Sequence, residues 1–113
     1  MEASGRLFEW RKSMKKLFIS QPMKDKTDEE ILKERENAIT KAKEALGEEV
    51  EVIDSYFTED EPQGVNSGLW YLGKSLELLS TSDIVYFADG WDQARGCIIE
   101  HTCAVEYGID IID

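Results

Sequence analysis

Glu100 is the side chain in this sequence best suited to chemistry, because its position on a helix conflicts with its charge. The segment 94–108 predicts a helix that opens from a loop. At about 100° per residue, Glu100 shares a face with Cys97, Cys103, Ala104 and Tyr107. A carboxylate on such an apolar face needs a partner, a raised pKa or a function.

The loop before this helix carries two more acids, Asp89 and Asp92. The same short stretch contains Gly90, Trp91, Arg95 and Gly96. Carboxyl groups beside an aromatic ring, a cation and flexible glycines are a combination typical of binding and catalytic sites. We therefore take this loop and the helix of Glu100 as the candidate site.

Length and composition bound the classes of function. The 113 residues suffice for one domain, and 42% hydrophobic content favours a globular fold. A formal net charge of −11 argues against binding to a nucleic-acid polymer or an anionic membrane surface. A small nucleotide is not excluded, because a helix N-terminus can hold a phosphate within an acidic protein. No apolar run approaches the roughly 20 residues of a membrane span, and no signal peptide is evident.

The two cysteines also indicate where the chain resides. Cys97 and Cys103 are six residues apart on one predicted helix, about 9 Å of rise, which is too far for a disulfide. Reduced thiols favour a cytoplasmic location. The acidic run 59–61 is expected to be a solvated loop, and neither a metal site nor a cofactor is predicted.

Strands and helices alternate along the chain after a separate N-terminal stretch. Residues 1–13 are interpreted as an arm, which is an upstream extension, a cloning remnant or a genuine element, and residues 14–113 as the domain. Apolar runs predict strands at 17–19, 50–53, 84–87 and 109–112.

Helices are predicted between these strands. Thr27 with Glu30 forms a capping-box pattern, and Gly47 closes the same helix. The apolar face of that helix is expected at Ile31, Leu32, Ile39, Ala42 and Leu46. A leucine stripe at 69, 72, 76 and 79 marks the next helix.

This alternation predicts an α/β fold of three layers, doubly wound around a mostly parallel sheet of four to five strands, as in flavodoxin-like and Rossmann-like proteins. In such sheets ligands lie beyond the carboxyl ends of the strands. Three loops leave those ends, at 20–27, 54–66 and 88–95. We expect these loops to converge on one site.

Four segments resemble the nucleoside 2-deoxyribosyltransferase-like family, most closely a small phage-associated branch of it. They are FISQPM at 18–23, GLWYLGKSLELL at 68–79, DIVYFADGW at 83–91 and RGCIIEHTCAVEYG at 95–108. The resemblance covers roughly residues 15–113. It implies that Glu100 is the nucleophile that takes the deoxyribosyl group and that the Gly96 amide approaches the 5′ end of the sugar.

The implied chemistry assigns roles to the other candidate residues. Cleavage of an N-glycosidic bond develops oxocarbenium character, which a carboxylate can trap, while a second acid assists departure of the base. Asp89 is the first candidate for that acid and Asp92 the second. Trp91 and Trp70 are expected to stack on a nucleobase, and Arg95 with the Gly96 amide to receive a 5′-phosphate. Ser20, Gln21 and Met23 are expected to close the pocket.

One position departs from the pattern of the family. Its characterised members carry an aspartate on the second helix, and the corresponding position, eight residues before Asp83, is Ser75. A serine cannot perform the acid–base work of a carboxylate. Either Asp89 or Asp92 substitutes for the missing acid, or the pocket binds nucleotides through Ser75 and its neighbours with little turnover.

Structural alternatives remain open at several positions. Glu100 could pair with Arg95 or Lys74 at a subunit contact, and Arg95 could form a surface ion pair. Trp70 adjoins the leucine stripe, which favours a place in the core or a dimer interface over a ligand platform, and His101 lies off the Glu100 face.

The leading prediction is an enzyme that transfers or hydrolyses the N-glycosidic bond of a 2′-deoxynucleoside or its 5′-monophosphate. The alternatives are a non-catalytic nucleotide-binding phage protein and a structural oligomer subunit. In each case a homo-oligomer, a homodimer at the smallest, is expected.

Overall fold

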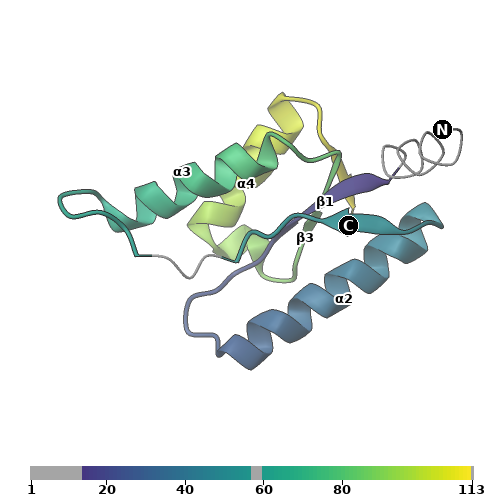
Figure 1. Ribbon diagram of the computed structural model, residues 1–113, viewed down its shortest axis with the longest axis horizontal. Helices are drawn as coiled ribbons and strands as arrows, with labels where there is room; N and C mark the ends of the chain where they lie inside the picture. Colours follow the sequence, from purple (N-terminus) through teal and green to yellow (C-terminus); the bar gives the residue numbers. More distant parts are fainter. Residues whose placement is uncertain (1–13, 57–59, 113) are drawn as a thin grey trace, which may run out of the picture.

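The chain forms a single parallel sheet covered by three α-helices, as the computed structural model shows for residues 14–56 and 60–112 (Figure 1). In chain order the elements are β1 (Lys15–Ser20), α2 (Asp28–Leu46), β2 (Val50–Val52), α3 (Ser67–Leu79), β3 (Ile84–Phe87), the short 3₁₀ helix η1 (Trp91–Gln93), α4 (Arg95–Glu106) and β4 (Asp110–Ile112). The predicted arm at 1–13 lies outside the described residues. No helix in the described ranges has the length and apolar character needed to span a membrane.

The sheet has the strand order β2-β1-β3-β4, and every neighbouring pair is parallel. The predicted α/β, doubly wound architecture is therefore confirmed, with four strands. The order reverses direction between β1 and β3, so the loops after these two strands diverge to opposite sides. That point is where open parallel sheets of this kind bind ligands.

The two faces of the sheet carry separate cores, because successive strand residues point to opposite sides. On one face Leu17, Ile19 and Tyr86 pack with Ala38 and Ala42 of α2. On the other face Phe18, Val85 and Phe87 pack with Leu79 of α3 and Ala104 of α4. Figure 1 shows the same layers, with α2 on one side of the strands and α3 and α4 on the other.

Local signals place α2 as predicted. Thr27 accepts a hydrogen bond from the Glu30 amide, and the Glu30 carboxylate accepts one from the Thr27 amide, so the capping box is formed. Gly47 ends the helix with a positive φ of 68°, a conformation that glycine adopts without steric cost. The predicted face was wrong at Leu32, which is 54% exposed, because Ile31, Arg35, Ala38 and Ala42 face the sheet instead.

The leucine stripe of α3 is only partly buried. Asn66 caps the helix by accepting a hydrogen bond from the Leu69 amide, and Leu79 at the other end is buried in the core. Leu69 was expected in the stripe but is 66% exposed. Figure 1 shows that the N-terminal half of α3, which carries Leu69, extends past the sheet.

Candidate active site

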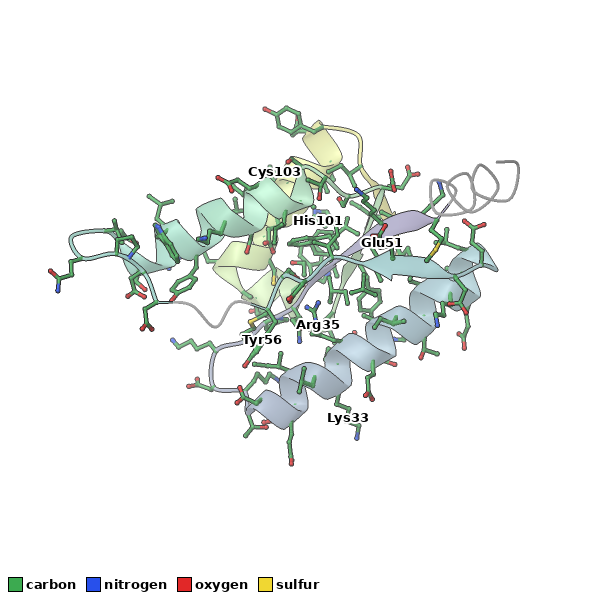
Figure 2. All side chains as sticks on the ribbon, viewed as in Figure 1. Lys33, Arg35, Glu51, Tyr56, His101 and Cys103 are labelled. Carbon is green, nitrogen blue, oxygen red and sulfur yellow. The ribbon has the colours of Figure 1, made fainter. Side chains whose placement is uncertain are left out.

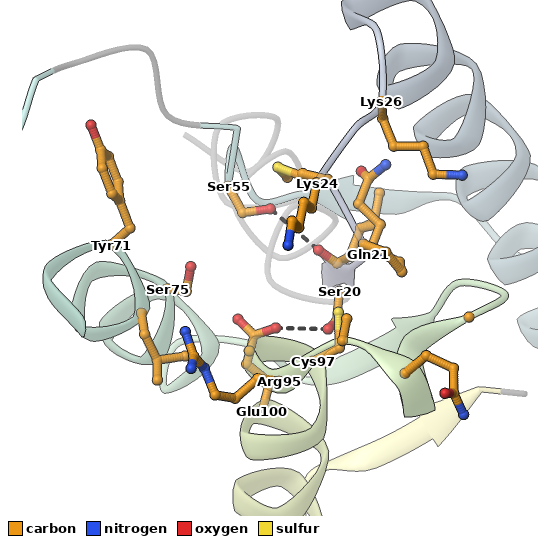
Figure 3. Close-up of a pocket in the computed structure, with 18 of the residues that line it drawn as sticks. Ser20, Gln21, Lys24, Lys26, Ser55, Tyr71, Ser75, Arg95, Cys97 and Glu100 are labelled. Carbon is orange, nitrogen blue, oxygen red and sulfur yellow. Dashed lines mark hydrogen bonds between the residues drawn. The ribbon is translucent and has the colours of Figure 1, made fainter. Parts of the chain in front are cut away.

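The three predicted loops converge on one cavity at the carboxyl edge of the sheet. The cavity has a volume of about 720 Å³ and lies over Glu100 (Figure 3). The loop after β1 contributes residues 20–26, and the loop after β2 contributes Ser55. The segment from Asp89 to Glu100 and one face of α3 complete the wall. A volume of this size lies in the range of small-molecule sites.

Glu100 is the buried acid of this cavity. Only 6% of the residue is exposed, and its carboxylate accepts a hydrogen bond of 2.7 Å from the Ser20 hydroxyl. Burial raises the pKa of Glu100, while hydrogen bonds from the Ser20 and Ser75 hydroxyls act in the opposite direction. Figure 3 shows both serines beside the carboxylate, one from β1 and one from α3.

The described residues do not form the ion pair between Arg95 and Glu100 that is one structural alternative for this acid. Within residues 14–56 and 60–112 the Arg95 guanidinium is not within salt-bridge distance of the Glu100 carboxylate. The Lys74 ammonium lies 4.8 Å from the centre of the Trp70 ring. Within the described part of the chain, the Glu100 carboxylate is held by the hydroxyl groups of Ser20 and Ser75.

Cys97 belongs to the same buried cluster. It lies one helical turn before Glu100, and it is only 4% exposed. Burial raises the pKa of the Cys97 thiol, a hydrogen bond with Ser20 lowers it, and the charge of Glu100 raises it further. Cys97 and Cys103 are free thiols, as the spacing predicted. Tyr107 does not share this face, because α4 ends at Glu106 and Tyr107 is 84% exposed.

The N-terminus of α4 forms one end of the cavity. Arg95 and Gly96 line it, and the N-cap residue Ala94 supplies no side-chain cap. The amides of the first turn therefore have neither an intrahelical acceptor nor a capping side chain. No heavy atom lies within 4 Å of a Cβ placed on Gly96, so the space in front of this backbone is open. Such an end suits an anion.

The loop after β1 forms the opposite wall. Gln21 and Met23 line the cavity as predicted. The same loop contributes two cations that sequence reasoning did not select, Lys24 and Lys26. With Arg95 they bring three positive charges to the wall of a pocket in a protein of net charge −11.

The loop after β2 is attached to α2 by a buried arginine (Figure 2). Arg35 is 8% exposed and donates hydrogen bonds of 3.2 Å to the Ser55 hydroxyl and to the Ile53 carbonyl. Burial lowers the pKa of Arg35, and the charge of Asp54 raises it. Tyr56 adds a hydrogen bond from its hydroxyl to Asp28 at the start of α2. These contacts position Ser55 in the cavity wall.

The two predicted acids differ in their placement. Asp89 follows β3 and lines the cavity. Asp92 lies in η1, where it is exposed and is not among the lining residues. Of the two predicted acids only Asp89 therefore lines the cavity, and Asp25 of the loop after β1 lines it as well.

The predicted tryptophan platforms do not line the cavity. Trp91 stacks on His101 of α4, with ring centroids 4.1 Å apart and an interplanar angle of 13°, and it also packs against Phe87. Trp70 packs edge-on against Tyr71 at 4.9 Å. Both rings are engaged by neighbours within the chain. The aromatic residues that line the cavity are instead Phe18, which is buried in the core, and Tyr71, whose hydroxyl donates a hydrogen bond of 3.0 Å to Glu61.

Tyr71 could have been found from helical spacing. The lining residues of α3 are Gly68, Tyr71, Leu72 and Ser75, which follow the i, i+3, i+4, i+7 pattern of one helix face. Since Ser75 was already a candidate, the same face predicts Tyr71, whereas Trp70 is rotated by about 100° from it. Lys24 and Lys26 carry no comparable signal, because the direction of a loop side chain has no period.

Among the described residues no three His, Cys, Asp or Glu side chains come together in an arrangement that could hold a metal ion. The chain matches no protein-family model, no curated protein and no solved structure in the comparisons made.

Proposed function

We propose that the protein cleaves or transfers the N-glycosidic bond of a 2′-deoxynucleoside or its 5′-monophosphate, with Glu100 as the nucleophile. The observation that carries this proposal is the buried Glu100 carboxylate at the cavity wall, where it accepts a hydrogen bond from Ser20. Burial of a carboxylate is costly, and a buried acid with a raised pKa in a cleft is a candidate for function.

The proposed reaction proceeds in two steps. A Glu100 carboxylate oxygen attacks C1′ of the deoxyribose, the C1′–N bond breaks, and the base leaves with a proton supplied by an acid. Water or a second base then attacks C1′, and the C1′–O bond to Glu100 breaks. Asp89, which lines the same cavity, is our candidate for the proton transfers.

The rest of the wall suits the parts of such a substrate. A 5′-phosphate is matched by Arg95 and the uncapped amides of α4. Tyr71 takes the place of the tryptophans as the aromatic surface for the base. Ser20, Gln21 and Met23 close the pocket from the loop after β1.

The test combines chromatography and calorimetry. The protein is incubated with the four 2′-deoxynucleosides and their 5′-monophosphates, with and without a second free base, and the released or exchanged base is quantified. Base release or exchange supports the proposal. Titration calorimetry with the same compounds measures binding independently of turnover. A protein that neither binds nor converts any of them would contradict the proposal.

The second candidate is a nucleotide-binding phage protein that sequesters its ligand without turnover. Ser75 favours it, because this serine stands where the family that the sequence resembles carries an aspartate, and it contributes only a hydroxyl to Glu100. Binding in calorimetry without any released base would select this function.

The Ser20→Ala substitution is expected to move the acidic limb of the pH–rate profile to higher pH. The Ser20 hydroxyl stabilises the ionised form and lowers the pKa of Glu100. Its removal raises that pKa, so a higher pH is needed to ionise the nucleophile. The measurement is kcat/KM for base release against pH. Ser82→Ala is the control, because the Ser82 hydroxyl bonds the Leu79 carbonyl, and an equal shift in both variants would argue against this role.

A homo-oligomer is the assembly that we propose for this domain. Val65 and Leu69 are 42% and 66% exposed at the start of α3, beside the partly buried Trp70. A large apolar group at the projecting end of a helix favours burial by a second copy. Light scattering after size exclusion is expected to give at least a dimer, and Leu69→Glu a smaller species. Glu77→Gln, an exposed position on the same helix, is the control. A monomeric wild-type protein would contradict the proposal.

A further inference from the structure

A second cavity adjoins the candidate active site on the α2 side of the loop after β1. Its volume is about 440 Å³, and it is bounded by α2 and the end of β3. The two cavities share four wall residues, Gln21, Pro22, Lys26 and Asp89. They therefore meet along one rim, at the point where the strand order of the sheet reverses.

Gln21 is an incompletely satisfied group in that rim. The residue is 7% exposed, and its Nε2 donates a hydrogen bond of 3.2 Å to the Ile31 carbonyl. Its Oε1 is buried without a hydrogen-bond partner, the one such side-chain atom among the described residues. Buried acceptors are normally paired, so this oxygen is suited to an N–H donor from a ligand. In Figure 3 the carboxamide lies on the Lys26 side of the loop, away from Glu100.

The smaller cavity suits a flat polar ring. Ile31 and Ala88 give it a buried apolar part, and the Asn37 carboxamide and Glu34 carboxylate add acceptors on the α2 side. Lys26 supplies a cation to the rim that both cavities share. An apolar surface with acceptors around it matches a nucleobase bearing N–H groups, and a cation between two such spaces matches a phosphodiester.

We infer that the two cavities together bind a dinucleotide, with one nucleoside over Glu100, the linking phosphate at Lys26 and the second base in the cavity beside α2. This inference rests on the proposed function of the larger cavity and extends its ligand from a mononucleotide to a phosphate-linked pair. Gln21 Oε1 and the Asn37 side chain would then select a second base that carries N–H donors.

Titration calorimetry with two probes tests the inference. The probes are thymidine 5′-monophosphate and the 5′-phosphorylated dinucleotide of thymidine and deoxyadenosine, each titrated into the full chain at the same ionic strength. We expect the dinucleotide to bind at least about tenfold more tightly. Equal dissociation constants would overturn the second subsite while leaving the proposed function standing. Failure of both probes to bind would overturn both proposals.

Two variants test whether the tighter binding of the dinucleotide arises in the smaller cavity. Asn37→Ala changes an exposed residue that lines only the smaller cavity, so the dinucleotide should lose most of its advantage while the mononucleotide constant is unchanged. Lys33→Ala alters the charge of the same cavity. If it weakens both probes equally and Asn37→Ala does nothing, the second base is not bound there and the inference fails.

Gln21→Met separates ligand recognition from a structural role. Methionine fills a similar volume and removes the unpaired oxygen, so thermal stability is expected to be kept or increased. The affinity ratio of dinucleotide to mononucleotide is expected to fall towards one. A variant that is destabilised yet keeps the full ratio would show that Gln21 serves the fold alone, and it would overturn the assignment.

Discussion

Glu100→Gln is expected to abolish base release, by on the order of 10³-fold or more, while making the folded protein more stable at neutral pH. The amide keeps a carbonyl oxygen for the Ser20 hydroxyl but cannot form the covalent intermediate. It also removes a charge from a wall where Glu100 is only 6% exposed. Removal of this buried charge is expected to raise the free energy of unfolding by about 1 kcal/mol. Chromatography of released base and thermal unfolding measure the two effects.

The stability gain is expected to depend on pH in a defined direction. Burial raises the pKa of Glu100 in the folded state above its value of about 4.3 in an unfolded chain. The wild-type protein therefore has its full stability below the unfolded pKa and loses part of it as pH rises through the folded pKa. The difference between Glu100→Gln and wild type should be small near pH 4 and larger at pH 7.

A matched control is available on the same helix. Glu106→Gln removes an exposed acid from α4 and is expected to leave both activity and the pH dependence unchanged. A Glu100→Gln variant that still releases base at the wild-type rate would exclude Glu100 as the nucleophile. A variant that is inactive but has lost stability at pH 7 would show that burial of the charge is not a cost.

Arg35→Ala is expected to lower the free energy of unfolding by about 2–3 kcal/mol and to weaken ligand binding at a distance. The substitution removes two hydrogen bonds from a charged donor, to Ser55 and to the Ile53 carbonyl, together with the packing of the aliphatic stem. Part of this loss is offset because a buried charge is also removed. Since Ser55 lines the larger cavity, its release should weaken nucleotide binding.

Chemical denaturation and calorimetry test this expectation. Lys33→Ala is the control for stability, because Lys33 is exposed on the same helix and such substitutions usually change stability by less than about 0.5 kcal/mol. Equal stability of the two variants would mean that the contacts of Arg35 contribute nothing. Arg35→Lys is expected to restore only part of the loss, because one ammonium does not reproduce the fork of a guanidinium.

The sequence predicts the fold well where the signals are local. Thr27 with Glu30, Gly47 and the apolar run 84–87 each specify a boundary or a strand within a few residues, and all are found. The burial of a helix face is harder to predict from the sequence, because another element must pack against that face. Leu32 and Leu69 have the hydropathy of core residues, but they are 54% and 66% exposed in the described part of the chain. Leu32 lies outside the face of α2 that packs on the sheet, and Leu69 lies where α3 extends past the sheet.

The candidate site also combines features that the sequence predicts with features that it does not predict. The convergence of the three loops follows from parallel topology, and the burial of Glu100 from its position beside Cys97 and Ala104. The partners of the aromatic rings do not follow from sequence. Trp91 meets His101, ten residues later, only because η1 turns the chain back over α4. The unpaired oxygen of Gln21 depends on the path of a loop, which no periodic pattern describes.

The two outer strands bear on how this protein behaves at high concentration. β2 and β4 have three residues each and carry exposed acids, Glu51 and Asp110. Short, negatively charged edges discourage strand pairing between molecules. This protection comes from repulsion between negatively charged molecules, and it depends on ionised carboxylates. It weakens as the solution is acidified towards the isoelectric point near 4.5, so the pH of purification and storage governs how long the edges of this sheet remain separate.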